Sequence, residues 1–490
     1  MKVWNRPLSG SVKRLKDNLE VEMKDIIFGT DGWRGIIAKE FTFENLHRVA
    51  LGFASYLRRH KKNNVFIGYD ARFFSDKFAR EFAEVLSSLN IKTYISTRII
   101  PTPVLSFGVL HLKADAGVMI TASHNPAEYN GVKFKSYLGG SVTKEVTDEI
   151  EKNISGLKKK TEINLEDVRT DLIQEIDIVP EYLKYICSNI QIPLVSKKRF
   201  RIVFESMGGA GLGFIEKIIT DSEIINISEK YDPLFKGRHP EPLLENVKEA
   251  RKTVINEKAD LGVVTDGDGD RIAFIDNKGN FISSQKILGY LLLHLIKNKG
   301  YSSGVGRTFA VSALIENICK RNRLKLFTKP IGFKYIAELM ENGEIGFGGE
   351  ESGGIGYKPH LIERDGIFIA LLTLEMMAME NKSLTGIIRE MEKEYGSFYY
   401  DRVDLRISKN QINKFRDKLP KLMPKTIAGL KVLGVDKLDG KKFILEKGSW
   451  LLMRPSGTEP LVRVYSESLE KDKVRALLNA GTGFVLGKTP

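Results

Sequence analysis

The sequence predicts an α/β protein of several domains, because it is long, its strand and helix patterns alternate, and this pattern changes near its end. At 490 residues, three or four domains are expected. Strand and helix patterns alternate through the first two-thirds, which favours parallel sheets with helical crossovers. The pattern restarts near Arg201 and again near Ile282. The last part is typical of a small α+β domain.

The expected elements of the first two-thirds follow from short apolar runs and from amphipathic runs. Strands are expected at residues 65–69, 91–96, 116–120, 201–204, 259–265 and 304–310, and helices at 76–89 and 104–112. The apolar run 287–296 is expected to form a buried helix. It is too short to span a bilayer, so no membrane segment is predicted.

The final part differs in the order of its patterns. Strands are expected at 398–407, 450–453 and 461–466, and helices at 411–419 and 470–479. We therefore expect a tail at residues 1–24 and domains at 25–175, 176–280, 281–393 and 394–490.

Composition and charge exclude several classes of protein. A hydrophobic content of 42% and a charged content of 28% are ordinary for a globular protein. The first 24 residues mix charges without an apolar core, so they are not a secretory signal and are expected to be partly disordered. Two cysteines, Cys187 and Cys319, do not make a disulfide framework, which favours a cytoplasmic enzyme.

The formal net charge of +14 fits nucleic acid, a membrane surface or small anionic substrates. No lysine- and arginine-rich block interleaved with aromatic residues is present, and no nucleic-acid motif. We expect a generic solvated surface and no nucleic-acid partner, and we keep a nucleic-acid binder as the last alternative.

The run from Asp266 to Arg271, Asp-Gly-Asp-Gly-Asp-Arg, is the most informative segment. Its three carboxylates stand at alternate positions after a buried strand, so they can converge on one point. Such charges repel unless a cation lies between them, and Mg²⁺ is the natural occupant. A surface turn is the competing interpretation. An EF-hand is rejected, because Arg271 and Asn277 stand where glycine and glutamate are needed.

A second loop, Thr-Ala-Ser-His-Asn-Pro from Thr121 to Pro126, directly follows the expected strand 116–120. Ligands bind at strand ends of α/β sheets. Ser123 is a candidate nucleophile or phosphate carrier, with His124 beside it, and Lys133 supplies a cation nearby. Taken alone, this loop fits a plain turn better.

Three further loops carry polar groups on glycine-rich backbone. Glu350 and Ser352 lie in the run Gly348–Gly354, which suits sugar recognition. Arg454 begins Arg-Pro-Ser-Gly-Thr-Glu-Pro, a candidate anion nest between two strands. Arg34 lies in the glycine-bounded run 28–35. A flexible acidic loop, a hairpin turn and a structural turn are the respective competing interpretations.

The order of these loops resembles that of the α-D-phosphohexomutase family. TASHNP, DGDGDR, GEESGG and RPSGTEP follow one another over roughly residues 25–480. The resemblance implies three similar α/β domains with mixed sheets plus a smaller C-terminal α+β domain around a central cleft. Each domain would contribute one loop to that cleft.

The resemblance also implies a role for each candidate residue. Ser123 is similar to a serine that carries a phosphoryl group, and its oxygen completes a Mg²⁺ site. The implied catalytic residues are Ser123, His124, Lys133 and Arg271; the implied metal ligands are Ser123, Asp266, Asp268 and Asp270; the implied substrate contacts are Arg34, Lys334, Glu350, Ser352, Arg454, Ser456, Gly457 and Thr458.

The implied activity is phosphohexomutase. Phosphoserine would pass its phosphoryl group to a hexose phosphate, and a hexose 1,6-bisphosphate intermediate would turn over and return its other phosphate. Phosphoryl transfer needs positioning and charge neutralisation, which Mg²⁺ and Arg271 would supply. Lys133 and His124 are both candidates for moving the proton. The expected partner is a small sugar phosphate, and the chain is expected to be a monomer or homodimer.

The substrate is expected to be a glucose or mannose phosphate, because the GEES and TASHNP loops look most like those enzymes. A phosphoglucosamine mutase is the alternative. A catalytically silent sugar-phosphate binding protein is a third, against which the intact Ser123, aspartates and Arg454 loop argue.

Overall fold

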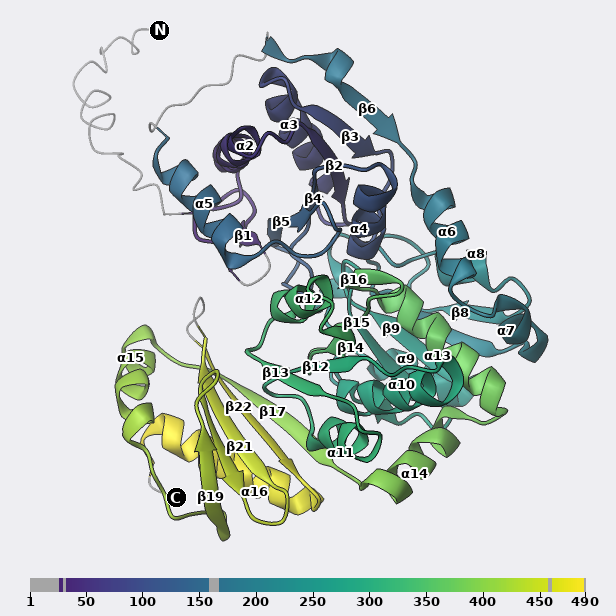
Figure 1. Ribbon diagram of the computed structural model, residues 1–490, viewed down its shortest axis with the longest axis vertical. Helices are drawn as coiled ribbons and strands as arrows, with labels where there is room; N and C mark the ends of the chain where they lie inside the picture. The colour runs from purple at the N-terminus through teal and green to yellow at the C-terminus, as the bar shows by residue number, and fades with distance from the viewer. Residues whose placement is uncertain (1–25, 30–31, 158–166, 457–460, 489–490) are drawn as a thin grey trace, which may run out of the picture.

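The computed structural model describes residues 26–29, 32–157, 167–456 and 461–488, which form four sheets with their own helices (Figure 1). Three sheets are mixed and the fourth is antiparallel throughout, which confirms the predicted fold class. The expected tail at 1–24 lies outside the described residues, as do Gly457 and Thr458.

The first sheet has the order β1-β5-β4-β2-β3-β6. Its central strands are parallel, and β5 and β1 run antiparallel at one edge. Alternate residues of β2 point to opposite faces. Val65 and Ile67 therefore pack with α2, α3 and α5, whereas Phe66 packs with α4. The elements are β1 (Trp33–Ile36), α2 (Phe43–Arg59), β2 (Asn64–Tyr69), α3 (Ser75–Ser88), β3 (Lys92–Ser96), α4 (Thr102–His111), β4 (Ala116–Ile120), β5 (Tyr129–Ser136), α5 (Lys144–Ser155) and β6 (Ile173–Ile176).

The second sheet has the order β11-β10-β9-β7-β8 and carries the aspartate run between β9 and β10. Strands β7, β8 and β9 are parallel, and β10 returns antiparallel to β9. The aspartate run is therefore the turn of a hairpin inside the molecule. The elements are α6 (Val179–Ser188), α7 (Ile192–Lys198), β7 (Arg201–Glu205), α8 (Ile215–Ile218), β8 (Glu223–Asn226), α9 (Lys248–Asn256), β9 (Leu261–Thr265), β10 (Ile272–Asp276) and β11 (Phe281–Ile282).

The third sheet has the order β13-β12-β14-β15-β16. Its helix α13, apolar on all sides, also packs against β9 and β10 of the second sheet. One apolar cluster consequently runs through the first three domains and includes Val104, Ile202 and Ile287. The elements are α10 (Ser284–Lys299), β12 (Gly304–Thr308), α11 (Ala313–Arg321), β13 (Leu326–Lys329), α12 (Phe333–Glu341), β14 (Ile345–Gly349), β15 (Ile355–Tyr357), β16 (Leu361–Arg364), α13 (Gly366–Glu380) and α14 (Leu384–Tyr395).

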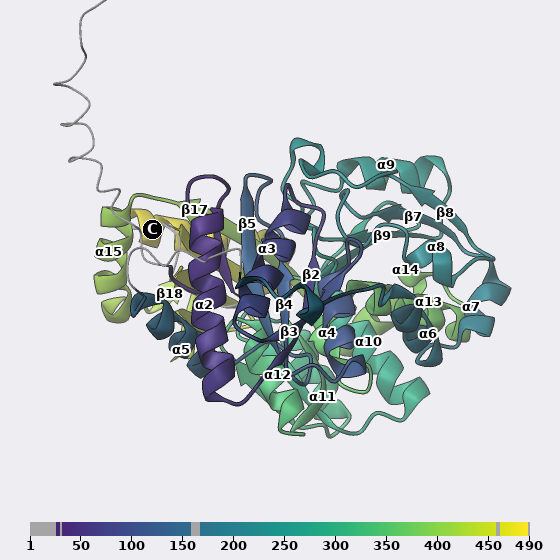
Figure 2. The ribbon, with the colours of Figure 1, turned by 90° about the horizontal axis from the view of Figure 1, so that it is seen from above.

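The fourth sheet has the order β17-β22-β21-β20-β19-β18 and a core of its own, formed with α15 and α16. In Figure 1 it lies at the lower left, apart from the other three sheets, whereas in the view of Figure 2 it lies behind α2. The elements are β17 (Tyr399–Arg406), α15 (Lys409–Lys418), β18 (Thr426–Ile427), β19 (Leu430–Asp436), β20 (Lys441–Leu445), β21 (Trp450–Pro455), β22 (Leu461–Ser468) and α16 (Lys471–Leu486).

Helix α16 is longer than the sequence predicts, because it continues through Gly481 and Gly483 to a C-cap at Gly487 with φ +75°. A β-carbon on Gly481 would lie 2.5 Å from Val464 Cγ1 of β22. This glycine serves close packing of the helix on the sheet and does not end the helix. Among the described residues, no helix is long and apolar enough to cross a membrane.

Candidate active site

The serine loop follows the carboxyl end of β4 and is held by a buried polar network. The Ser123 N–H donates to Thr121 Oγ1 at 2.8 Å, and the Ser123 carbonyl accepts from the Arg72 guanidinium at 2.7 Å. Ser123 has φ +55°, in the left-handed region, and its surroundings must hold this unfavourable conformation. The loop is thus a fixed platform, not a mobile turn.

The aspartate run brings its three carboxylates together. One oxygen from each of Asp266, Asp268 and Asp270 lies within 4.8 Å of the others, and all three residues are buried. The backbone wraps around Asp266, whose Oδ1 accepts the N–H groups of Asp270 at 3.0 Å and Arg271 at 3.1 Å. The interpretation of this run as a surface turn is therefore wrong.

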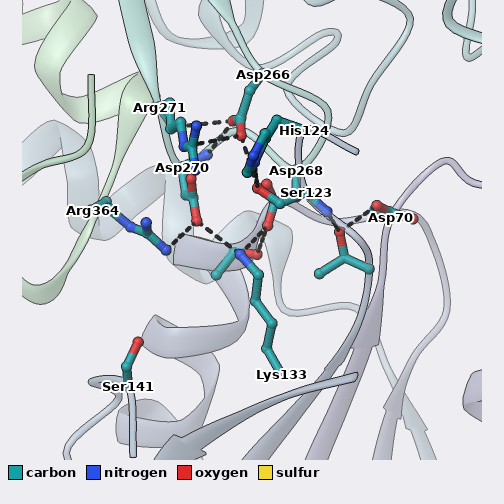
Figure 3. Close-up of polar contacts among 12 residues, drawn as sticks. Asp70, Ser123, His124, Lys133, Ser141, Asp266, Asp268, Asp270, Arg271 and Arg364 are labelled. Carbon is teal, nitrogen blue, oxygen red and sulfur yellow. Dashed lines mark hydrogen bonds and ion pairs between the residues drawn. The ribbon is translucent and has the colours of Figure 1, made fainter. Parts of the chain in front are cut away.

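The serine loop and the aspartate run lie against each other (Figure 3). Ser123 Oγ donates to Asp266 Oδ2 at 3.1 Å. Lys133 of β5 reaches into the same group, with Nζ 2.7 Å from Asp268 Oδ2 and 3.0 Å from Asp270 Oδ2. Residues far apart in the sequence therefore form one buried charged centre.

Arg364 completes this centre from the end of β16. Its guanidinium contacts Asp270 Oδ2 at 2.7 Å and Glu350 Oε2 at 3.3 Å. The expected sugar-binding loop is thus joined to the aspartate run through a shared arginine. A backbone bridge between Arg271 and Gly354 fixes the same two loops together.

Burial and neighbouring charges separate the pKa values of the aspartates. Burial, followed by repulsion from Asp268 and Asp270, raises the pKa of Asp266 well above its usual range. Burial also raises the pKa of Asp268, but the Lys133 ammonium and the Thr102 hydroxyl outweigh it and lower this pKa overall. The pKa of His124 is held well below its usual range by burial and then by the nearby arginines, so its imidazole is neutral.

The donor set fits a hard divalent cation. Among the described residues, Asp268 Oδ1 and Asp270 Oδ1 are buried and have no hydrogen-bond partner. Buried carboxylate oxygens normally have partners, and three carboxylates converging on one point are what Mg²⁺ prefers. A divalent cation in this triad would satisfy both oxygens and neutralise the repulsion.

Of two further candidates, one lies beside the serine loop and the other at the start of α12. Arg34 of β1 donates from Nη1 to Asn125 Oδ1 at 2.8 Å, so it lies next to the serine loop. Lys334 is the second residue of α12, and its Nζ lies 5.3 Å from the centre of the Tyr335 ring.

Arg454 and Ser456 form a separate group on the fourth sheet. The Arg454 Nε donates to Asp439 Oδ1 at 2.8 Å. The Asp439 carboxylate also accepts from the N–H of Ile331, at the start of the loop before α12. Ser456 is buried and its carbonyl accepts from Arg416. Gly457 and Thr458, expected beside them, lie outside the described residues.

A cleft of about 1230 Å³ lies between the four domains. Each domain contributes to its walls: His124 from the first, Glu241 from the second, Ser352 from the third, and Arg402 and Arg463 from the fourth. The central cleft of the predicted architecture is therefore present.

Several charged residues and one threonine of this region were not singled out from the sequence. They are Arg364, Glu241, Arg402 and Arg463, together with Asp70, Arg72 and Thr102 beneath the loops. The sequence could have indicated Arg402, because the alternation of the predicted strand at 398–407 places Arg402 and Asp404 on one face. Arg364 carried no signal, since nothing near it in the sequence indicates its partners.

Comparison with known proteins agrees with this architecture. Four family models described as phosphoglucomutase/phosphomannomutase match: alpha/beta/alpha domain I at residues 25–161, domain II at 180–279, domain III at 283–395 and the C-terminal domain at 413–480. A Thermococcus kodakarensis phosphoglucomutase/phosphomannomutase is 31% identical, with 93% of this chain and 97% of that protein covered. A Sulfurisphaera tokodaii phosphoglucosamine/phosphogalactosamine mutase is 30% identical, with 94% and 99% covered.

A solved structure extends the likeness to three dimensions. A protein from Thermus thermophilus, assigned as a phosphomannomutase, superimposes with a TM-score of 0.85 at 35% identity, over 95% of this chain and 100% of that one. Fold and site define an enzyme of the phosphohexomutase class, an isomerase that transfers a phosphoryl group within a sugar phosphate. The chain belongs to the phosphoglucomutase/phosphomannomutase family.

Proposed function

We propose that this enzyme interconverts hexose 1-phosphate and hexose 6-phosphate, with glucose or mannose as the sugar, through a phosphoserine at Ser123. The observation that carries the proposal is the contact of 3.1 Å between Ser123 Oγ and Asp266 Oδ2 in the buried aspartate triad. A serine with no role in phosphoryl transfer has no evident reason to lie in a strained backbone conformation against three carboxylates.

In the proposed reaction, the bond between Ser123 Oγ and phosphorus breaks as a bond forms between phosphorus and a free hydroxyl oxygen of the hexose phosphate. The hexose hydroxyl gives up its proton, and Ser123 Oγ takes up a proton as it leaves, so the serine is restored as an alcohol. The resulting hexose 1,6-bisphosphate turns over in the cleft and returns its other phosphoryl group to Ser123. The volume of about 1230 Å³ leaves room for that turn.

Asp266, Asp268 and Asp270 would hold Mg²⁺, with an oxygen at Ser123 as a further ligand. Bound Mg²⁺ supplies charge neutralisation for the phosphoryl oxygens. Lys133 holds Asp268 and Asp270 in place and adds positive charge at the same point. Arg271 covers the site from the other side, with Nε 4.0 Å from Asp266 Oδ2.

His124 is the better placed of the two candidates for accepting the proton. Its Nδ1 lies 3.4 Å from Ser123 Oγ, and its lowered pKa keeps it neutral and able to accept. Lys133 donates to two carboxylates instead, which stabilises its charged form. We assign proton transfer to His124 and electrostatic stabilisation to Lys133.

The remaining candidates would bind the sugar and its second phosphate. Glu350 and Ser352 would accept from sugar hydroxyls, with Lys334 and Arg34 nearby. Arg454, Ser456, Gly457 and Thr458 would bind the phosphate that is not being transferred. A solved N-acetylphosphoglucosamine mutase from Aspergillus fumigatus was determined with GlcNAc-6P and magnesium, and shares the fold at 16% identity, a TM-score of 0.56 and 94% and 96% coverage.

Phosphoglucosamine mutase activity is the second candidate, because a relative of about the same identity carries that name. A coupled assay decides between the two. It would follow glucose 6-phosphate formation from glucose 1-phosphate with Mg²⁺ and a trace of glucose 1,6-bisphosphate, and then rank mannose and glucosamine phosphates.

The Ser123→Ala variant tests the phosphoserine directly, since it removes the phosphoryl carrier. We expect its turnover to fall to background. Near-normal turnover in this variant would exclude Ser123 as the carrier. A wild type that is active only on glucosamine phosphate would replace the proposed substrate and keep the chemistry.

A further inference from the structure

Two arginines from different domains meet at one carboxylate oxygen in the wall of the cleft. Glu241 Oε1 lies 3.2 Å from Arg271 Nη1 and 3.9 Å from Arg402 Nη2. Arg271 directly follows the aspartate triad of the second domain, whereas Arg402 lies on β17 of the fourth. Glu241 therefore connects the charged centre to the domain that carries the expected phosphate-binding loop.

The backbone at Glu241 is fixed against the aspartate run. Pro240 and Pro242 flank it and restrict its conformations. The Pro240 carbonyl accepts from the N–H of Gly267 at 3.1 Å, and the Glu241 carbonyl accepts from Asn246 Nδ2 at 2.9 Å. The carboxylate is thus presented from a rigid segment, and its position follows that of the triad.

Arg402 belongs to a polar face of the fourth sheet that is turned toward the cleft. In the register of β17 and β22, Arg402 lies opposite Tyr465 and Asp404 opposite Arg463. Arg402 Nε contacts Asp404 Oδ1 at 3.0 Å, which holds the guanidinium on its own sheet. Its outer nitrogen is left to reach Glu241. A shift of the fourth domain would change this contact.

The orientation of Arg271 follows from these contacts. Its Nη1 is bonded to Glu241, while its Nε is buried and has no hydrogen-bond partner among the described residues. Nε is 4.0 Å from Asp266 Oδ2, too far for a hydrogen bond. Glu241 therefore holds one edge of the guanidinium and leaves the other directed at the place where phosphoryl oxygens would lie.

We propose that Glu241 is a positioning residue that aligns Arg271 with the transferring phosphoryl group and couples this alignment to the position of the fourth domain through Arg402. This inference rests on the proposed mutase function. When the fourth domain grips the distal phosphate, Arg402 meets Glu241, and Arg271 is then fixed for transfer. The side chains of Glu241, Arg271 and Arg402 are only 13%, 10% and 18% exposed, so solvent weakens the contacts little.

A double-mutant cycle tests the coupling. Glu241→Gln keeps the size of the side chain and removes its charge, and Arg402→Met removes the partner. We expect each variant to lower kcat by about 10- to 100-fold with KM changed less than about threefold, because misplacing a transition-state contact acts on kcat. The double variant should be no slower than the slower single variant. Glu245→Gln is the matched control, since this exposed residue lines the same cleft wall, and it should keep both constants.

Three results would overturn the proposal. A lower KM in Glu241→Gln would mean that Glu241 competes with the substrate phosphate. Additive losses in the double variant would mean that Glu241 and Arg402 act separately. If Glu241→Gln had the same kcat and KM as the control Glu245→Gln, Glu241 would have no positioning role.

A measurement without substrate separates this inference from the proposed function. The radius of gyration in solution should rise in Glu241→Gln, in Arg402→Met and, by the same amount, in the double variant, because the fourth domain can then move away from the second about its apolar contact with the third. It should stay unchanged in Glu245→Gln. A wild type inactive on every hexose phosphate would defeat the proposed function. The radius of gyration would then still test whether Glu241 couples the second and fourth domains, and an unchanged value in Glu241→Gln would overturn that coupling.

Discussion

The charged centre at Ser123 and the polar face of the fourth sheet are both rich in paired charges, but they are built in opposite ways. The centre is buried, and the three domains that supply it share one continuous apolar cluster. The fourth sheet has a core of its own and meets the third domain through a second, smaller apolar cluster, and its arginines pair with carboxylates of the same domain. The difference indicates that the proposed phosphoryl transfer takes place at a rigid site, and that the second phosphate is bound by a domain that can move.

Physical reasons support that division. In a buried site a charge without its partner costs several kcal/mol, so the centre must keep its geometry. On the fourth sheet, Arg402, Arg454 and Arg463 each have a carboxylate partner within their own domain, so their charges stay compensated when the domain shifts. The proposed reaction needs this asymmetry, because one end of the substrate would react at a rigid point while the other is released and bound again.

Replacing Lys133 should give the largest effect and tests whether the centre is fixed for chemistry. Lys133→Met removes the cation that holds Asp268 and Asp270. We expect kcat to fall by about 10²- to 10³-fold and the free energy of unfolding to fall by about 3–5 kcal/mol. Steady-state kinetics and denaturant unfolding would measure the two changes.

Lys135→Met is the matched control for that experiment. Lys135 lies two residues further along β5 and forms a fully buried ion pair with Glu363. Its loss should destabilise the protein by a similar amount, because buried Glu363 loses its lysine partner and keeps Arg364, at 3.3 Å. Its turnover below the melting temperature should stay within a few-fold of wild type. Equal losses of turnover in both variants would show that Lys133 acts through stability alone.

Replacing Arg454 should give a smaller and different effect. Arg454 lies on the fourth sheet beside Asp439, and in the proposed function it binds the phosphate that is not transferred. Arg454→Ala should raise KM by about 10- to 100-fold, the range of one lost charge-assisted contact, with kcat changed much less. A fall in kcat at unchanged KM would mean that Arg454 acts in phosphoryl transfer, as the residues of the buried centre do. The two regions would then not differ in function.

The sequence predicts much of the charged centre but little of what joins the two regions. Asp266, Asp268 and Asp270 lie within five residues of one another, so their convergence is local and could be predicted without a structure. The run folds as a hairpin turn, however, and not as the extended segment on which the alternation was expected. Arg364 and Glu241 act through partners that only the packing of domains brings near. No local pattern marks such residues.

The length of α16 shows the same limit within the fold. Glycine lowers helix stability, so the sequence favours an end near Asn479. In the structure the close approach of β22 at Gly481 overrides this preference. Tertiary packing, which a pattern of single residues does not contain, decides both the helix and the inter-domain contacts.

That helix supplies the smallest expected effect and tests whether the fourth domain is an independent unit. Gly481→Ala would force a methyl group to 2.5 Å from Val464 Cγ1, and overpacking of this kind costs about 1–3 kcal/mol. Gly483→Ala meets only the Lys488 carbonyl, at 3.4 Å, and should stabilise the helix by up to about 1 kcal/mol. Gly481 lies in the fourth sheet's own core, on the opposite side from the cluster that joins Trp450, Leu452 and Tyr465 to Phe309 and Ala310 of the third domain. Gly481→Ala should therefore lower the stability of the fourth domain while the rate of Ser123 phosphorylation by glucose 1,6-bisphosphate stays unchanged. Calorimetry that resolves a second, unshifted transition would support two cooperative units, whereas a single transition shifted as a whole would show that the four domains unfold together.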